Sequence, residues 1–402
     1  MLVFGAAVAR MPSARRATGR IEAAAWPYLP GSIVPLRVNG FAPPFGAALL
    51  GPGQLSPRGF YEVPQAPEPG TALLVAGNSV GLATASVRFA APPPRDRPLL
   101  AVASYDDGLI FHDAGDFSVL GVLGTGGAPS DVAADSLGRF AVTDTEGTVL
   151  TLATLAPWSV ARIDGVSFGD EVAIDRTTRD IFVTDRDLKG SGALTRVGAG
   201  ANITSVATGV TAEGLAVDDR RQIVYVANAN DGTIASIGAR SMRRLERFHA
   251  VNRIFSLALA PDGTRLYGIS NQSAGSPFGA PGAAVSLALD RPVPRVVARS
   301  GNLGFPIGVA LDSARQTLFV TDEGLNTIYV LDARTLRPKH SALHTCATPW
   351  KPSIDSASER LYVPCAGANA IDVFNVRTLR RVPHAPFTTG SYPLAVAIWH
   401  PK

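Results

Sequence analysis

The sequence predicts an all-β protein, and three features of its composition and pattern carry that prediction. Its 402 residues include 40 Gly and 31 Pro, together 71 residues, a share well above the usual ~12% that implies many turns. Charged residues make up 17% and hydrophobic residues 46%, which is too apolar for a disordered chain. Short apolar segments also recur along most of the chain at a nearly constant spacing. Many short strands joined by frequent turns are typical of the all-β class.

Residues 1–29 are interpreted as the remnant of a signal peptide followed by a linker. The apolar segment LVFGAAVA ends in Ala7-Val8-Ala9, which matches the small-residue pattern of a cleavage site, with no basic segment before it. An Ala-, Arg- and Pro-rich stretch then continues to about Pro30. An accidental apolar segment is the alternative. The cleavage pattern favours export, so we predict a periplasmic or extracellular protein.

Residues 30–92 are expected to form a small immunoglobulin-like β-sandwich. Five strand-like segments follow one another there, separated by Gly, Pro and Asn turns: SIVPLRVNGF, FGAALLGPG, GFYEVP, TALLVAG and VGLATASVRF. The stretch from Gly77 to Gly81 matches G-x-S-x-G but lies between two of these segments, so it predicts a hairpin turn and not a catalytic serine. The proline-rich stretch from Ala91 to Pro98 is a stiff linker.

A unit of four strand-like segments repeats over residues 98–402. Clear copies begin at Pro129, Ala212 and Pro306, each with three apolar strands and a more polar fourth. The ends of the second strands define the register: Ser104, Asp144, Asp185, Asn228, Ser270, Asp322 and Cys365, which are 40, 41, 43, 42, 52 and 43 residues apart. A period of about 42 residues with four strands per unit is typical of a β-propeller blade.

The number of units predicts seven blades in a closed ring. The first unit lacks its opening strand, and the segment YPLAVAIWHPK is an opening strand with nothing after it. We therefore expect residues 393–399 to pair with the blade that begins at Pro98, which removes the sheet edge of an open ring. The spacing of 52 marks an insertion from Asn271 to Gly282.

Two family resemblances follow from the repeat. The segments LFVTDEGLNTIYVLD, VYVANANDGTIASI and IFVTD resemble the YVTN-type β-propeller repeat family over roughly residues 98–402, which implies a scaffold that serves many roles. Ala212-Glu213-Gly214 is similar to the metal-binding E-G-P motif of the gluconolactonase and regucalcin propellers, with Leu215 in place of the proline. That second resemblance implies a metal-dependent hydrolase or lactonase. A propeller lyase would need a histidine near the channel mouth, and no good candidate is found.

The mouth of the central channel is the predicted ligand site, because the residues that enter the first strands surround it. The predicted ligand-binding residues are Asp131, Asp170, Glu171 and Glu213 on one arc and Phe255, Trp350 and Lys351 on the other. The carboxylates would hold a divalent cation, with Asp170 and Glu213 as its ligands, or another cationic ligand. The aromatic residues would pack against its apolar part. Lys351 is expected to lie several blades away from the carboxylates. A water-facing rim without a ligand is the alternative.

No other motif predicts catalysis or a cofactor. None of the histidines forms a helical zinc pair, and we interpret all six as surface or packing residues: His112, His249, His340, His344, His384 and His400. The segments from Asp185 to Asp187 and from Asn228 to Gly232 resemble calcium loops faintly, but Asp, Asn and Gly are also ordinary turn residues.

The net charge of +4 does not indicate a nucleic-acid partner, because the basic residues are scattered apart from two clusters. These clusters are expected on outer edge strands, where charge discourages aggregation: Arg243, Arg244 and Arg247, and Arg377, Arg380 and Arg381. No stretch approaches the ~20 apolar residues of a membrane helix, so no membrane span is expected.

Cys346 and Cys365, the two cysteines of the chain, are predicted to form a disulfide. Antiparallel pairing of the first two strands of one repeat would bring them to the same edge, and two buried thiols are the alternative. A disulfide favours an oxidising compartment. We therefore predict an exported, non-catalytic binding or interaction scaffold, with an unknown protein or small ligand on the propeller face. The metal-dependent hydrolase or lactonase is the alternative function.

Overall fold

The computed structural model describes residues 20–22, 25–35, 37–39, 46–56, 60–66, 68–78, 81–186, 191–271, 281–291 and 293–402. These residues form β-strands and two short 3-10 turns, η2 (Ala199–Ala201) and η3 (Ala366–Ala368), and none of them lies in an α-helix. The predicted all-β class is therefore confirmed. The chain divides into two compact units, Met1–Pro92 with Gly121–Gly126 and Pro93–Leu120 with Gly127–Lys402. No described helix is long and apolar enough to cross a membrane.

The smaller unit contains three small antiparallel sheets among its described residues, with strand orders β1-β3, β2-β6-β5 and β4-β7-β8. The strands are β1 (Arg20–Glu22), β2 (Ile33–Pro35), β3 (Arg37–Asn39), β4 (Gly46–Leu50), β5 (Gln54–Leu55), β6 (Phe60–Glu62), β7 (Gly70–Asn78) and β8 (Gly81–Phe89). Tyr61 is fully buried, and its ring lies 6.2 Å from that of Phe89. Each predicted strand segment contains an observed strand, and the immunoglobulin-like arrangement stays a prediction.

The G-x-S-x-G match lies at the turn between β7 and β8. Asn78 pairs with Gly81, so β7 and β8 are adjacent antiparallel strands, as expected for a hairpin. Ser79 lies outside the described residues, as do residues 1–19 of the expected leader and residues 272–280 of the expected insertion.

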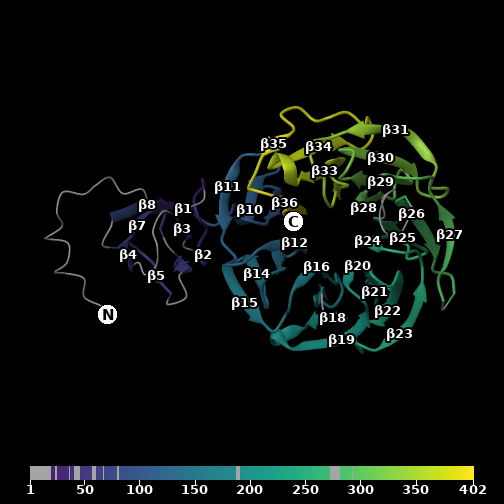
Figure 1. Cartoon of the computed structure of the whole chain (residues 1–402), viewed down its shortest axis with the longest axis horizontal. Helices are drawn as coiled ribbons and strands as arrows, with labels where there is room; N and C mark the ends of the chain where they lie inside the picture. The colour runs from purple at the N-terminus through teal and green to yellow at the C-terminus, as the bar shows by residue number, and fades with distance from the viewer. Residues whose placement is uncertain are drawn as a thin grey trace. The chain divides into compact units, whose positions relative to one another are not determined.

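The larger unit is a β-propeller, in which seven described four-stranded antiparallel sheets surround one centre (Figure 1). The strands of each sheet are given from the innermost outward. The first three sheets are sheet 1 (β36, Pro393–Trp399; β9, Leu99–Ser104; β10, Gly108–Asp113; β11, Val119–Leu123), sheet 2 (β12, Pro129–Ala134; β13, Arg139–Asp144; β14, Val149–Leu155; β15, Trp158–Asp164) and sheet 3 (β16, Gly169–Ile174; β17, Ile181–Asp185; β18, Gly192–Val197; β19, Ile203–Gly209). The other four are sheet 4 (β20, Ala212–Asp218; β21, Ile223–Asn228; β22, Thr233–Gly238; β23, Arg244–His249), sheet 5 (β24, Ile254–Leu259; β25, Arg265–Ser270; β26, Ala283–Ala288; β27, Arg295–Arg299), sheet 6 (β28, Pro306–Asp312; β29, Thr317–Asp322; β30, Thr327–Asp332; β31, Pro338–His344) and sheet 7 (β32, Ser353–Asp355; β33, Arg360–Cys365; β34, Ala370–Asn375; β35, Phe387–Thr388).

The predicted register is confirmed strand by strand. The second strands end at all seven predicted positions, from Ser104 of β9 to Cys365 of β33. β36 pairs antiparallel with β9 from Pro393 opposite Ser104 to Trp399 opposite Leu99, which is the pairing expected for residues 393–399. One sheet thus combines strands from the two ends of the repeat region.

The second strands are continuous apolar segments because both of their faces are covered by neighbouring sheets. Phe182 of β17 and Phe319 of β29 occupy equivalent places, Phe140 of β13 lies one position earlier in its strand, and all three are fully buried. Burial of one such ring contributes roughly 1.5–3 kcal/mol. The outer strands are polar by contrast: Arg244 and Arg247 of β23 are exposed.

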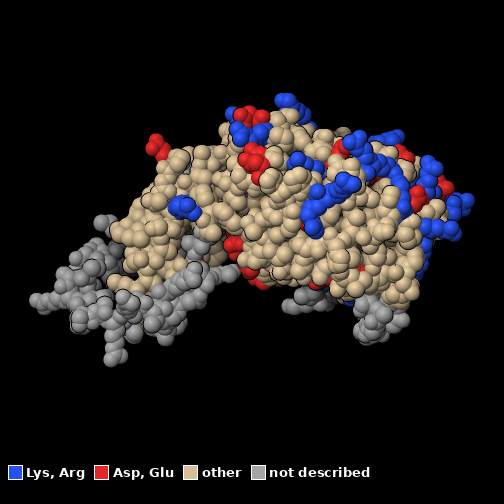
Figure 2. All heavy atoms as spheres, turned by 90° about the horizontal axis from the view of Figure 1, so that it is seen from above, with Lys and Arg blue, Asp and Glu red and all other residues tan. Residues whose placement is uncertain are grey.

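One of the two basic clusters lies where the sequence predicts and the other does not. β23, with Arg244 and Arg247, is the outermost strand of sheet 4, and Figure 2 shows Lys and Arg gathered on the upper side and right end of that view. Arg377 lies in a turn and Arg381 in an isolated bridge after β34, so the expectation of an edge strand is wrong there. Arg381 instead forms an ion pair with the buried Asp372, so its charge neutralises that carboxylate.

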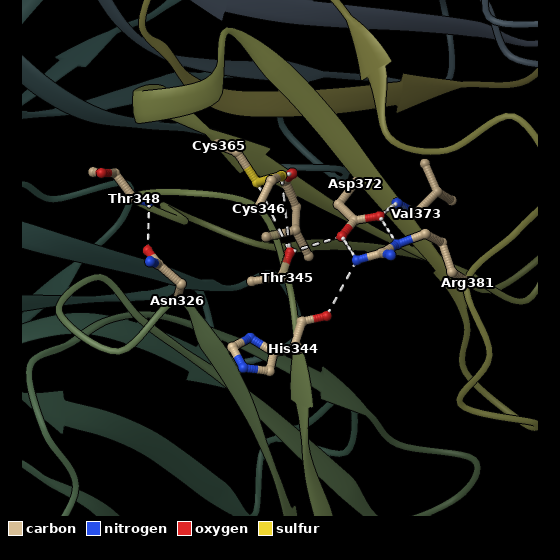
Figure 3. Close-up of a disulfide and its surroundings, with 10 residues drawn as sticks. Asn326, His344, Thr345, Cys346, Thr348, Cys365, Asp372, Val373 and Arg381 are labelled. Carbon is tan, nitrogen blue, oxygen red and sulfur yellow. Dashed lines mark hydrogen bonds and ion pairs between the residues drawn. A yellow bond between two sulfur atoms is a disulfide. The ribbon is translucent and has the colours of Figure 1, made fainter.

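The predicted disulfide is present between Cys346 and Cys365, whose Cα atoms lie 5.7 Å apart. Beside it, the fully buried Asp372 accepts hydrogen bonds from Thr345 Oγ1 at 2.9 Å and from Arg381 Nε and Nη2, both at 2.8 Å (Figure 3). The segment between β31 and β32 is therefore fixed by a covalent bond and by the hydrogen bond from Thr345 to Asp372. Disulfides persist in oxidising compartments, so this bond supports a protein located outside the cytoplasm.

Replacement of both Cys346 and Cys365 by Ser is expected to lower the free energy of unfolding by about 3 kcal/mol, because the open chain gains entropy when the loop is no longer closed. Guanidinium unfolding of wild type and variant would measure this difference. Dithiothreitol should bring the wild type to the midpoint of the variant and leave the variant unchanged. Equal midpoints without the reductant would contradict the prediction.

His112 of β10 is a packing residue. It is fully buried, its Nε2 lies 2.9 Å from Thr389 Oγ1, and its ring lies 5.1 Å from that of Phe387. Its Nδ1 lies 3.0 Å from the Phe117 carbonyl oxygen, so a neutral ring that donates from Nδ1 and accepts at Nε2 satisfies both partners. Burial lowers the pKa of His112 from 6.5 to about 4.

This shift predicts sensitivity to acid. Because the folded-state pKa lies below the unfolded value, the contribution of His112 to stability is present above pH 6.5 and is lost as the pH falls through about 4. His112→Gln should be less stable than wild type at pH 7 and should lose less further stability between pH 7 and pH 4.5. Thermal melts at the two pH values would test this, and equal losses in both proteins would refute it.

Candidate functional site

The channel mouth is formed by irregularities at the start of the first strands. The pairing of first and second strands shifts between Pro129 and Val132, between Gly169 and Val172, and between Ala212 and Leu215. The residues left out of the ladder are Ser130, Asp131, Asp170, Glu171, Glu213 and Gly214. A bulge redirects the side chains that it contains, so the predicted carboxylates are released from the regular sheet pattern at this edge.

A repeated Thr-Asp pair at the end of the second strands supports this edge. The Thr143 hydroxyl accepts from Asp131 N at 3.1 Å, and the Thr184 hydroxyl accepts from Glu171 N at 2.9 Å. Thr184 Oγ1 also donates to the Glu213 carbonyl of the next sheet at 3.0 Å. These threonines therefore satisfy backbone groups that the bulges release and join each sheet to its neighbour.

The carboxylates of Asp131 and Glu171 also join neighbouring sheets around the ring. Asp131 Oδ2 accepts from Val172 N at 3.0 Å, and Glu171 Oε2 accepts from Leu215 N at 2.6 Å. Each carboxylate thus reaches the first strand of the following sheet. Asp131 and Glu171 hold neighbouring sheets together before any ligand is considered.

Lys351 also joins this network, which corrects the expectation that it lies far from the carboxylates. Its Nζ lies 3.0 Å from Glu171 Oε1 and 4.0 Å from Asp131 Oδ2. Lys351 precedes β32 of sheet 7, whereas its partners belong to sheets 2 and 3, so its side chain crosses the channel. Burial alone would lower the pKa of Lys351, but Glu171 and Asp131 outweigh this effect and raise it, which keeps the ammonium charged.

Arg186 partners the other two carboxylates. It follows β17, its Nε lies 3.3 Å from Glu213 Oε1, and its Nη1 lies 4.0 Å from Asp170 Oδ1. Two bases therefore face four carboxylates. Burial raises the pKa of Glu171 to about 8 and, with help from the charge of Asp170, that of Glu213 to about 7. Burial likewise raises the pKa of Asp131.

Four polar atoms of this region are buried without a hydrogen-bond partner among the described residues: Asp170 Oδ2, Arg186 Nε, Glu213 Oε2 and Trp350 Nε1. The side chains of Asp170 and Glu213 are only 10% and 4% exposed. Unsatisfied buried groups of this kind cost roughly 1–3 kcal/mol each. Their convergence at one edge therefore indicates a place for a ligand or for ordered water.

A cavity of about 540 Å³ opens at this edge. Its walls combine aromatic, polar and charged residues, namely Tyr105, Asp106, Ser130, Thr145, Asp170, Arg186, Trp350, Lys351, Tyr392 and Leu394. The rings of Tyr105 and Tyr392 meet edge to face with their centroids 6.1 Å apart. The volume falls within the range of small-molecule pockets, about 300–1,000 Å³. We call this space the mouth pocket.

The structure brings some of the predicted site residues to the mouth pocket and places others elsewhere. Asp170, Trp350 and Lys351 line it, while Glu213 contacts it through Arg186. Phe255 does not take the expected place against a ligand. It is 6% exposed and packs in a core cluster with Ile307 and other apolar residues, because a large ring gains more from burial than from water contact.

Seven residues of the mouth pocket were not among the predicted ligand-binding residues: Tyr105, Asp106, Ser130, Thr145, Arg186, Tyr392 and Leu394. Tyr105 and Arg186 each directly follow a second strand, and Tyr392 directly precedes β36. The column one residue after each second strand contains Tyr105, Thr145 and Arg186, all of which line the pocket. A comparison of that column across the repeats would have pointed to Tyr105, Thr145 and Arg186 as pocket residues.

The faint calcium-loop segments do not converge on a metal. Asp231 Oδ1 accepts from Thr233 N at 3.0 Å, which is ordinary turn chemistry; Asp187 lies outside the described residues. Across the described part of the chain, no three His, Cys, Asp or Glu side chains are grouped so that they could hold a metal ion. The assignment of Asp170 and Glu213 as metal ligands stays a prediction.

No family model and no curated protein matches the chain. Solved structures do. A functionally unknown protein from Desulfotomaculum acetoxidans DSM 771 is 16% identical, with a TM-score of 0.64 over 76% of this chain and 99% of that one. A putative 6-phosphogluconolactonase from Bacteroides uniformis ATCC 8492 is 11% identical, with a TM-score of 0.60 over 75% of this chain and 99% of that one. A streptogramin B lyase is 11% identical, with a TM-score of 0.54 over 68% and 90%. At such identities the likeness shows the β-propeller fold alone.

Proposed function

We propose that this chain is an exported, seven-bladed propeller of the YVTN type that acts as a non-catalytic binding scaffold and holds a small ligand in the mouth pocket. The seven four-stranded sheets would be its blades. The Cys346–Cys365 disulfide supports a periplasmic or extracellular location. The immunoglobulin-like module would be a separate tether or binding surface.

The contact between Lys351 Nζ and Glu171 Oε1 at 3.0 Å carries this proposal. A metal-dependent hydrolase needs several acidic oxygens that converge on one ion. Here an internal ammonium pairs with Glu171 and Asp131, and backbone N–H groups donate to Asp131 Oδ2 and Glu171 Oε2. The charge that a divalent ion would supply is thus supplied by the chain itself, while the pocket beside it provides space for an organic molecule.

Metal analysis of the purified protein, before and after incubation with Ca²⁺, Mg²⁺, Mn²⁺ and Zn²⁺, tests the proposal. We expect no stoichiometric ion in either case and no hydrolysis of glucono-δ-lactone above the spontaneous rate. One divalent ion per chain together with lactone hydrolysis, both lost in Glu213→Gln, would establish the metal-dependent hydrolase instead. Asp262→Asn, in the turn between β24 and β25, is the matched control because it removes a carboxylate far along the chain from the mouth residues.

A further inference from the structure

At the mouth pocket, carboxyl groups outnumber the bases that contact them. Asp131, Asp170, Glu171 and Glu213 are four carboxylates, and Lys351 and Arg186 are the two bases that contact them. Asp106 is a further acid in the pocket wall. Burial raises the pKa of Glu171, Glu213 and Asp131 and so disfavours their charged forms. An additional positive charge beside these groups would stabilise the charged forms by Coulomb attraction.

Both bases already form ion pairs with the carboxylates, which disfavours an anionic ligand, although Arg186 Nε makes no hydrogen bond among the described residues. Lys351 Nζ lies between Glu171 and Asp131, and Arg186 lies between Glu213 and Asp170. An incoming anion would have to compete with these carboxylates for the same donors. Desolvating a further negative charge beside them would add to the cost.

Two carboxylate oxygens without hydrogen-bond partners also favour a cationic ligand. Asp170 lines the mouth pocket, its side chain is nine-tenths buried, and its Oδ2 has no partner among the described residues. Glu213 Oε2 is likewise without a partner. A carboxylate oxygen accepts hydrogen bonds, so its missing partner is an N–H or O–H donor, and a charged donor gives the stronger bond.

The aromatic walls distinguish an organic cation from a bare metal ion. The rings of Tyr105, Tyr392 and Trp350 line the pocket. Aromatic faces attract cations within about 6 Å of the ring centroid and pack against apolar groups. Ca²⁺ and Mg²⁺ prefer six or more oxygen ligands, and a cavity of about 540 Å³ is far larger than one ion needs.

We propose that the mouth pocket binds an organic cation, an amine or guanidinium compound with an apolar or aromatic body, whose charged group donates to Asp170 Oδ2 while its body packs against Trp350 and the two tyrosines. This inference rests on the proposed function, because it names the chemical class of the ligand in the same pocket. It identifies Asp170 as the residue that selects for positive charge.

Calorimetric titration of the full chain with three matched probes tests the inference: phenethylamine, the neutral phenethyl alcohol and the anionic 3-phenylpropionate. We expect phenethylamine to bind at least tenfold more tightly than the alcohol, and the carboxylate to bind most weakly. Asp170→Asn should lower the affinity for the amine at least tenfold and leave that for the alcohol within twofold. Trp350→Phe should weaken binding of the amine without altering the charge of the pocket.

The outcomes separate this inference from the proposed function. If the alcohol or the carboxylate binds as tightly as the amine, the pocket exists but does not select cations, and the inference alone is overturned. If none of the three probes binds, the small-ligand pocket itself is refuted. Asp262→Asn should bind all three probes as the wild type does, and unchanged melting temperatures of the variants would exclude misfolding as the cause of any loss.

Discussion

Removal of residues 393–402 is expected to abolish cooperative folding of the propeller. The deletion takes away β36, in which Leu394, Ala395, Val396 and Trp399 are each at least nine-tenths buried. It also exposes the backbone edge of β9, to which β36 is paired. Loss of one large buried side chain costs about 2–5 kcal/mol, so loss of the whole strand approaches or exceeds the ~5–15 kcal/mol that stabilises an ordinary domain.

Near-ultraviolet circular dichroism and a thermal melt would measure this effect. Deletion of Pro401 and Lys402 alone is the control, because both lie outside the strand. A synthetic peptide of residues 393–402 should restore part of the transition when added to the truncated chain. A cooperative melt of the truncated chain at the wild-type temperature would show that the closure contributes little.

Replacement of Lys351 by Met is the second change expected to have a large effect. The Lys351 side chain is 14% exposed and Glu171 is 8% exposed, so the substitution leaves buried carboxylates without a counter-charge. Removal of one partner of a buried pair costs roughly 3–5 kcal/mol. Denaturant unfolding at pH 8 should therefore show a midpoint well below that of the wild type.

Two comparisons show whether charge is the cause. In Lys351→Met combined with Glu171→Gln, one unpaired charge is gone, so part of the lost stability should return. The loss in the single variant should also shrink as the pH falls from 8 towards 5, because the raised pKa values of Glu171 and Asp131 mean that both become neutral as protons bind. A loss of equal size at both pH values would attribute the effect to packing of the lysine stem.

The fold was predictable because its signal is local and repeated. The Thr-Asp pairs that end β13, β17 and β29 mark the same place in three sheets, and the spacing between such places gives the size of the unit. The pairing of β36 with β9 followed from a count of strands, which needs no knowledge of side chains.

The candidate site was predictable only in part, because the sequence gives the order of the sheets around the ring but not the distance between side chains across the channel. Lys351 is far from Glu171 in blade order, yet a lysine side chain is long enough to cross the channel. Arg186 was missed because it lies one residue outside the columns that were compared. Phe255 occupies an equivalent place to Glu213, but its apolar ring turns into the core between sheets. Side-chain chemistry, and not strand register, decides these cases.

The closure of sheet 1 has a consequence for biosynthesis. Ser104 Oγ donates to the carbonyl of Ser391, and these residues are 287 positions apart. A nascent chain that has emerged from the ribosome only as far as β9 has no partner for the inner edge of that strand, and it gains one when β36 is made. Contacts of such long range also slow folding. The larger unit therefore stays unfinished until β36 has been translated.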